Sequence, residues 1–286
     1  MPERASTYRR FIAVMKNKKM YLQNLHTHTT YCDGNDTIEE MILAAYEKGF
    51  RSIGFSSHSF MKGCSLRKQV IDNYKYEIKE LKKKYADRIE VYCGIECEMY
   101  GNTDFSGFDY VIGAVHYLEL GDALFSIDRS LKELQVVIEK HFHGDGMACA
   151  KAYYRQLARL PEYGDFDFIA HFDLITKYCE QVHLFDYQAK EYRWAAIEAA
   201  EQLARKIPYF EVNTGAMARG YRTSPYPDMF LLKELKRLGF GAIISTDCHD
   251  SGKLDYGYLE AVEVLKKCGY KEQFILTKNG FIPIEL

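Results

Sequence analysis

Histidine and acidic residues follow directly after several short apolar runs of this sequence. Imidazole nitrogens combined with carboxylate oxygens, with no thiolate in an equivalent position, form the donor set of Zn²⁺, Mn²⁺ or iron rather than of Ca²⁺ or Mg²⁺ alone. A buried group of acids and imidazoles is costly unless cations offset its desolvation and like-charge repulsion. We therefore predict a metal centre built from His26, His28, Asp33, His58, Glu96, His116, His171, Asp247 and His249.

These donors are too many for one ion, which predicts two or three divalent ions and indicates hydrolytic chemistry. Adjacent ions lower the pKa of a bridging water toward about 7, and for a phosphate ester as substrate they would also bind its phosphoryl oxygens. An arginine would balance the charge that spreads over those oxygens; the candidates are Arg219 and Arg222, in the loop after Asn213. Asp247 and His249 are the candidate proton donors to the leaving alcohol, through a metal-bound water.

A second His-x-His pair, His141 and His143, lies between two predicted helices rather than after an apolar run. A lone pair of this kind is a weak metal signal, so we interpret it as a surface loop or a helix cap.

The candidate ligands need a scaffold that brings distant segments together. Short β-branched runs alternate with amphipathic stretches, which is typical of βα units around a parallel sheet or barrel. The predicted strands are 20–25, 52–56, 89–95, 110–114, 166–170, 209–213 and 242–246, with 274–277 as a candidate eighth. Loops at the carboxyl ends of barrel strands converge. The sequence thus predicts an α/β fold, a closed or nearly closed barrel with its site at that face.

Helix signals separate these strands. Thr37 and Glu40 form a capping box, and Gly49 ends the helix that it starts. Similar amphipathic stretches cover about 67–85, 129–139, 148–160, 186–205, 227–238 and 259–267.

Composition limits the class of protein. The chain has 286 residues, of which 47% are hydrophobic, enough for one large core. We predict a single domain at 21–286 after an N-terminal extension at 1–20. The formal net charge of -2 favours neither nucleic acid nor an anionic membrane as partner. The sequence predicts no membrane span and no signal peptide, because its apolar runs are too short.

The eight cysteines form no Cys-x-x-Cys pair and no disulfide spacing. This predicts reduced thiols and a cytoplasmic protein. Cys248 is expected to point into the core, away from its two neighbours in the sequence. Cys32, beside Asp33, is the other cysteine considered near the site.

Six motifs carry a resemblance to a known family. HTHTTYCDG (26–34), GFSSH (54–58), GIECE (94–98), GAVH (113–116), AHFD (170–173) and STDCH (245–249) resemble, in order, the motifs of the polymerase-and-histidinol-phosphatase (PHP) superfamily. The resemblance implies a distorted (β/α)₇ barrel, TIM-like, with up to three metals. It also implies the ligand sets: His26, His28, Glu96 and Asp247; Asp33, His58 and His249; and Glu96, His116 and His171, with Glu96 bridging.

Three further stretches resemble monofunctional histidinol-phosphate phosphatases: AVHYLELGD (114–122), HFDLITKY (171–178) and NTGAMARGYRTSPYP (213–227). The implied reaction is hydrolysis of L-histidinol phosphate to L-histidinol and phosphate, a step of histidine biosynthesis. The partner would be this small phosphorylated substrate. Tyr117, Glu98 and Glu119 are candidates to meet its imidazole and ammonium groups.

Two other enzyme classes remain as alternatives. Another phosphoesterase of the superfamily, a nucleotide phosphatase or exonuclease, would need a basic, aromatic groove for a strand, and no Lys/Arg cluster adjoins a predicted strand end. An amidohydrolase-type hydrolase commonly uses a mid-barrel lysine and a single final aspartate, whereas this chain has Glu96 and a final Asp-x-His.

Overall fold

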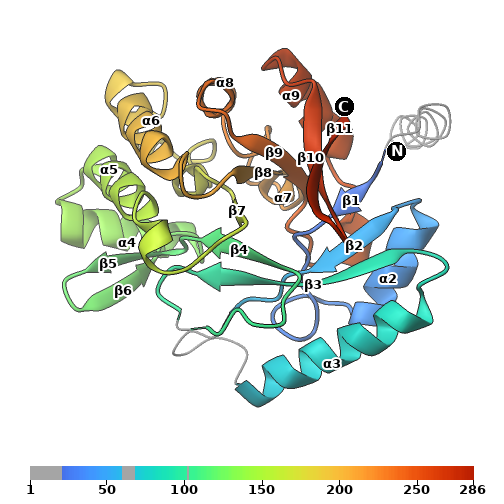
Figure 1. The fold of residues 1–286 in the computed structure, drawn as a ribbon. Helices are drawn as coiled ribbons and strands as arrows, with labels where there is room; N and C mark the ends of the chain where they lie inside the picture. Colours follow the sequence, from blue (N-terminus) through green and yellow to red (C-terminus); the bar gives the residue numbers. More distant parts are fainter. Residues whose placement is uncertain (1–20, 60–67, 102) are drawn as a thin grey trace, which may run out of the picture.

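Seven short parallel strands form the central sheet, in a computed structural model that describes residues 21–59, 68–101 and 103–286. The first and last strands meet beyond their ends, where Thr27 pairs with Cys248 and the His28 amide donates to the Cys248 carbonyl at 2.8 Å. The sheet therefore curves into the nearly closed barrel that the sequence predicted (Figure 1). In spatial order its strands are β1 (Gln23–Asn24), β2 (Ser52–Phe55), β3 (Glu90–Glu98), β4 (Tyr110–Ala114), β7 (Phe168–Ile169), β8 (Tyr209–Asn213) and β9 (Gly241–Ser245).

Helices cover the outside of this barrel, and the predicted capping box at Thr37 is present. The Thr37 side chain accepts from the Glu40 amide at 3.3 Å, and Glu40 accepts from the Thr37 amide at 2.8 Å. The helices are α2 (Ile38–Glu47), α3 (Lys68–Lys84), α4 (Leu131–Phe142), α5 (Gly146–Leu157), α6 (Lys190–Leu203), α7 (Gly215–Ala218), α8 (Met229–Arg237) and α9 (Tyr258–Lys267), with 3₁₀ turns at Leu160–Glu162, Leu174–Thr176 and Ser251–Lys253.

Alternation along the strands gives the barrel two different faces. The odd positions of β9 and the even positions of β4 bury their side chains in the barrel interior, and their neighbours pack against the helices. The interior is apolar at one end, with Tyr110, Phe168 and Ile243. Toward the carboxyl ends of the strands the same face carries buried polar residues, among them Glu96 and Glu211. Strand pleating thus aims these carboxylates at one end of the barrel.

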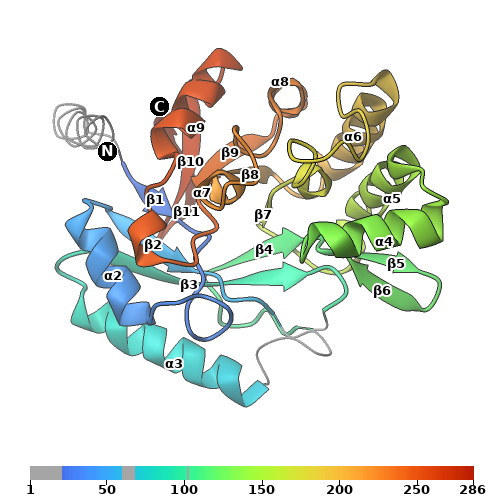
Figure 2. The same cartoon turned by 180° about the vertical axis from the view of Figure 1, so that it is seen from behind.

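Two antiparallel hairpins lie outside the barrel (Figure 2). One joins β5 (Tyr117–Leu120) to β6 (Ala123–Ser126), and sequence analysis did not predict it. The other joins β10 (Glu272–Thr277) to β11 (Gly280–Glu285). Its first strand is the candidate eighth barrel strand, so the seven-strand prediction was the right one. The side chain of Gln23 connects this hairpin to β1 through two hydrogen bonds with the backbone of Leu276, at 2.7 and 2.8 Å.

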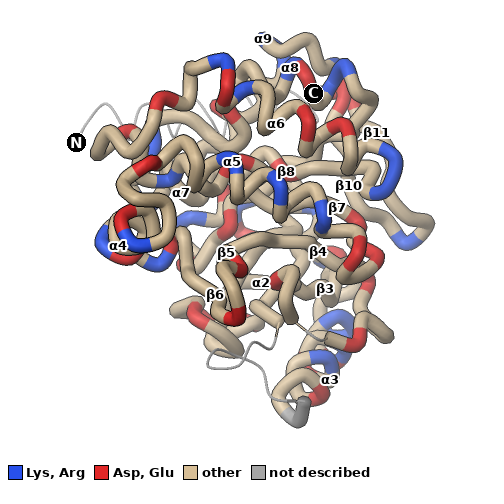
Figure 3. The backbone as a smooth tube through the Cα atoms, turned by 90° about the vertical axis from the view of Figure 1, so that its left-hand side faces the viewer, with Lys and Arg blue, Asp and Glu red and all other residues tan. Residues whose placement is uncertain are grey.

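Acidic and basic residues are interspersed along the outer helices and loops (Figure 3). Among the described residues, no helix is long and apolar enough to cross a membrane. The predicted extension at 1–20 lies outside the described residues.

Candidate metal centre

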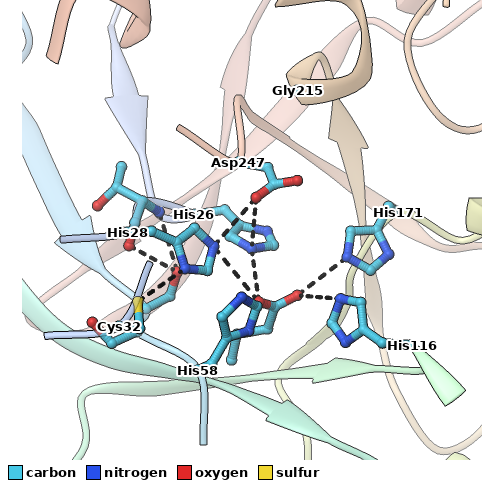
Figure 4. Close-up of polar contacts among 12 residues, drawn as sticks. His26, His28, Cys32, His58, His116, His171, Gly215 and Asp247 are labelled. Atoms are coloured by element: carbon cyan, nitrogen blue, oxygen red, sulfur yellow. Dashed lines mark hydrogen bonds and ion pairs between the residues drawn. The ribbon is translucent and has the colours of Figure 1, made fainter. Parts of the chain in front are cut away.

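All the predicted ligands lie at the carboxyl ends of the barrel strands. Barrel closure brings together residues that are up to 223 positions apart, from His26 to His249. Five imidazoles and the Asp247 carboxylate point toward a common centre (Figure 4). They follow β1, β2, β4, β7 and β9, so neighbouring strands each contribute to one cluster.

Glu96 on β3 occupies the middle of this cluster and is 1% exposed. Its two oxygens face different sides. Oε2 lies 2.8 Å from His58 Nδ1, 3.3 Å from His26 Nε2 and 3.6 Å from His28 Nε2. Oε1 lies 3.1 Å from His171 Nε2 and 3.4 Å from His116 Nε2. One carboxylate therefore connects the histidines of both sides, as a bridging ligand would.

Three groups of donor atoms are close enough to share an ion. They are His26, His28 and Asp247; His28, Asp33, His58 and His249; and Glu96, His116 and His171. These groups overlap closely with the ligand sets that the sequence resemblance implied. The differences are that His28 also adjoins the second set, and that Glu96 lies beside the first group, 3.3 Å from its His26.

The donor atoms themselves fit divalent cations. His26 Nε2, His28 Nε2 and Glu96 Oε2 are buried and make no hydrogen bond, and the two ring nitrogens lie within 3.6 Å of this shared Glu96 oxygen. Buried polar atoms are normally paired, so unpaired lone pairs turned toward one another indicate that another group completes their coordination. Nitrogen and oxygen donors in this mixture match Zn²⁺, Mn²⁺ or iron.

The electrostatics of the cluster favour added positive charge. Burial alone would raise the pKa of the Glu96 carboxyl, but His26, His58 and His116 outweigh it and hold that pKa well below its ordinary value. The same balance raises the pKa of His116 to about 9, because Glu96 and Glu98 outweigh the effect of burial. Carboxylates that draw protons onto imidazoles would equally favour metal cations in their place.

Two of the predicted ligands have unusual backbone conformations. The φ angles of Asp247 and His171 are 47° and 21°, in the left-handed region that residues with a Cβ rarely adopt. Such conformations persist only where surrounding contacts fix them, and they cluster at functional sites.

A cavity of about 520 Å³ opens above the cluster. Its walls include the predicted ligands Asp33, His58, Glu96, His116, His171, Asp247 and His249, together with Cys32, Ser59, Glu98, Tyr117, Ser126, Asp128, Arg129, Leu174, Lys177 and Arg219. This volume suits a small organic substrate.

Arg219, the first candidate clamp, lies on the cavity wall. Its guanidinium donates to Asp247 Oδ2 at 2.7 Å and to the Asp247 carbonyl at 3.0 Å. Gly215 leaves room for this pair, since a Cβ there would lie 2.8 Å from Arg219 Nη2.

Arg222, the second candidate clamp, lies elsewhere. It is 6% exposed, is absent from the cavity wall and stacks over the Tyr226 ring at 4.6 Å. Its guanidinium donates to Thr176 and Ser224. A tight turn separates the two arginines, so their side chains point in different directions. The sequence spacing could not predict which of them faces the cavity.

The other predicted substrate contacts differ in their surroundings. Tyr117 lines the cavity, and its hydroxyl accepts from Arg129 at 3.2 Å. Glu98 also lines the cavity, but its Oε2 already accepts from the ring and the backbone amide of His116, at 3.0 and 2.8 Å. Its Oε1 is buried without a hydrogen bond. Glu119 is exposed and is not part of the wall.

The remaining histidines and cysteines fall largely as predicted. His143 is the C-cap of α4, and His141 is exposed in its last turn, which confirms the helix-cap interpretation. Cys248 is 2% exposed in the core, also as predicted. Cys32 lines the cavity with its Sγ 3.4 Å from His28 Nδ1.

Sequence reasoning missed four charged residues of the site, Glu211, Asp128, Arg129 and Lys177. Glu211 lies inside β8, and its Oε1 is 2.7 Å from His26 Nδ1. Asp128 and Lys177 line the cavity, with Lys177 donating to the Asp128 carbonyl at 2.7 Å. The available signal for Glu211 was an acidic residue in the middle of an otherwise apolar strand, which predicts a buried carboxylate with a partner.

Known proteins resemble this chain in sequence and in fold. The family model described as "PHP domain" matches residues 24–215. A histidinol-phosphatase of Bacillus subtilis is 24% identical over 264 residues, covering 82% of this chain and 95% of the relative. The solved histidinol phosphate phosphatase of Lactococcus lactis, in complex with zinc, L-histidinol and phosphate, has a TM-score of 0.71 at 22% identity, covering 91% of this chain and 98% of that one.

Proposed function

The chain belongs to the PHP domain family, and we propose that it is a metal-dependent phosphatase that hydrolyses L-histidinol phosphate to L-histidinol and phosphate. The observation that carries the proposal is the Glu96-centred cluster at the floor of a cavity whose wall also holds Arg219. With divalent cations bound, this floor and the adjacent guanidinium would suit a phosphate ester.

Three ligand sets would hold the ions, two or three in number and chosen from zinc, manganese and iron. They are His26, His28, Glu96 and Asp247; Asp33, His58 and His249; and Glu96, His116 and His171. Divalent ions bound there would activate water for attack and neutralise the phosphate oxygens.

Arg219 would bind the phosphate from the side of the cavity. Two of its N–H groups are held by Asp247, which fixes the guanidinium plane and leaves its other N–H groups for phosphate oxygens. Because the guanidinium is oriented beforehand, little freedom is lost when substrate binds.

The leaving oxygen of histidinol needs a proton. Asp247 is poorly suited to supply one: burial would raise its pKa, but Arg219 and His26 hold it well below the ordinary value. His249 lies at the rim, with Nδ1 donating to the Asp247 carbonyl at 3.0 Å. As a ligand His249 would use Nε2, and its Nδ1–H is already donated, so we propose that the proton comes from water that reaches the rim beside His249.

The organic part of the substrate would lie against the wall formed by Glu98, Tyr117 and Asp128. Carboxylates and an aromatic ring are suitable partners for an ammonium group and an imidazole. Support also comes from the Lactococcus relative, which was solved with L-histidinol and phosphate.

The proposed setting is histidine biosynthesis in the cytoplasm. The cysteines that the structure describes are all free thiols, as a reducing compartment would keep them.

Release of inorganic phosphate across a substrate panel tests this function. The panel contains histidinol phosphate, nucleotides, sugar phosphates and short oligonucleotides, each at matched concentration with the metal-loaded protein. We expect the highest kcat/KM for histidinol phosphate, because contacts to the imidazole and ammonium supply binding energy in the transition state. Faster turnover of oligonucleotides or nucleotides would replace histidinol phosphate with that substrate class.

A further inference from the structure

Glu211 is fully buried in the middle of β8, behind the predicted metal ligands rather than among them. It does not line the cavity, so it cannot touch substrate. A charged group at 0% exposure needs several partners to offset its lost hydration.

Each carboxylate oxygen of Glu211 has two donors. Oε1 accepts from the ring of His26 at 2.7 Å and from the Ser245 hydroxyl. Oε2 accepts from the backbone amide of His171 at 2.9 Å and from the Asn213 side chain at 2.8 Å. The residue therefore acts as an acceptor only, at all four contacts.

The contact with His26 determines which ring nitrogen carries the proton. A carboxylate cannot donate, so Nδ1 of His26 must be the N–H that it accepts from. In the neutral ring the lone pair is then on Nε2, which is buried, makes no hydrogen bond and faces Glu96 Oε2 at 3.3 Å.

The contact with His171 acts on the backbone instead. Glu211 accepts from the amide of a residue whose φ is 21°, and the ring of that residue lies 3.1 Å from Glu96 Oε1. Glu211 thus contacts one ligand on each side of Glu96. It makes no hydrogen bond or ion pair with the described side chains of Asp33, His58 or His249.

We infer that Glu211 is a positioning residue for two of the metal groups: it holds His26 in the tautomer that presents Nε2 to a cation and fixes the backbone that presents His171. The inference rests on the proposed metal-dependent function and deepens it. Partners of this kind behind metal-bound histidines commonly change metal affinity about 10- to 100-fold.

Glu211→Gln is a sharp test because glutamine keeps the size of the side chain. One carboxylate oxygen is replaced by an N–H₂ group, which can only donate. All four neighbours of Glu211 at these contacts are donors, so this N–H₂ group would face donors instead of being hydrogen-bonded by them. Asp167→Asn is the matched control: Asp167 accepts from the Val111 amide at 2.7 Å at the opposite end of β7.

The measurement is metal binding rather than turnover. Chelator-treated proteins are titrated with Zn²⁺ against a chromophoric competitor, and the absorption spectrum of the Co²⁺-loaded forms is recorded. For Glu211→Gln we expect about 10- to 100-fold weaker binding of part of the ions, an altered Co²⁺ spectrum, and one ion held as in the wild type by the Asp33, His58 and His249 set. Asp167→Asn should bind as the wild type does.

Unchanged Zn²⁺ affinity and an unchanged Co²⁺ spectrum in Glu211→Gln would overturn the inference. Equal weakening of every ion, with a lower unfolding temperature of the metal-free protein, would also overturn it, because that is general destabilisation. Failure of the wild type itself to bind metal would instead contradict the proposed function.

Discussion

Glu96 is the residue on which the cluster depends most, because its two oxygens face histidines on both sides. Glu96→Gln should lower kcat/KM by more than about 100-fold, since the loss of outer partners alone costs 10- to 100-fold. Bound metal, measured by elemental analysis, should fall with it. His141→Ala is the control and should leave both unchanged, because that ring lies at the end of α4. Equal losses in the two variants would mean that the site is misplaced.

The two arginines of one loop should behave differently. Arg219→Ala should lower kcat/KM by about 100- to 1,000-fold with metal content retained, as for the loss of one preorganised donor at a charged site. Arg222→Ala should mainly reduce the free energy of unfolding, by about 3–5 kcal/mol, because it removes a buried cation near Asp173 and over Tyr226. Kinetics and denaturant unfolding separate these effects. A purely kinetic defect in Arg222→Ala would reverse the assignment.

Among the individual residues of the site, the sequence predicted those that directly follow a barrel strand. His58 and His171 could be placed because the carboxyl ends of all parallel strands open at the same face of the barrel. Arg222 could not, because the direction of a side chain in the 216–224 turn depends on contacts such as that with Thr176. Glu211 was missed although its place inside an apolar strand predicts a buried carboxylate, and only the fold shows that its partners are His26 and His171.

The turn that carries Asp33 depends on Gly34. A Cβ at that position would overlap the backbone of His28 and Thr29. Gly34→Ala should therefore shift the turn, cost about 1–3 kcal/mol as overpacking does, and weaken metal binding at the set that contains Asp33.

Thr37→Ala is the companion variant for this turn. It removes the cap of α2 and should cost about 1 kcal/mol without altering bound metal. Calorimetry measures the loss of stability in both variants, and elemental analysis measures their bound metal. Full metal occupancy in Gly34→Ala would contradict the role of the turn.

Most barrel elements could be predicted, and the exceptions have local causes. Periodicity located the seven parallel strands and the capping box located α2. The β5–β6 hairpin was missed although Gly121 and Asp122 separate two short apolar runs, a recognised turn signal. Strand β10 has the composition of a barrel strand, and only its pairing with β11 places it outside the sheet.

For the whole molecule, metal should be a stabilising ligand. Closure of the barrel crowds carboxylates and imidazoles that are distant in the sequence, and bound cations would offset their desolvation and repulsion. Ions present at 100 times their Kd stabilise a folded protein by about 2.7 kcal/mol per site. Thermal unfolding of the chelated protein should therefore begin several degrees lower, and readdition of Zn²⁺ or Mn²⁺ should restore it. An unfolding temperature indifferent to metal would count against a built metal site.

The most direct test of the account follows phosphate release from histidinol phosphate while metal is returned to chelated protein in measured equivalents. Activity should be absent without metal, rise as the cluster fills, and reach its maximum at two or three ions per chain. Full hydrolysis by protein that holds less than one ion per chain would contradict the account.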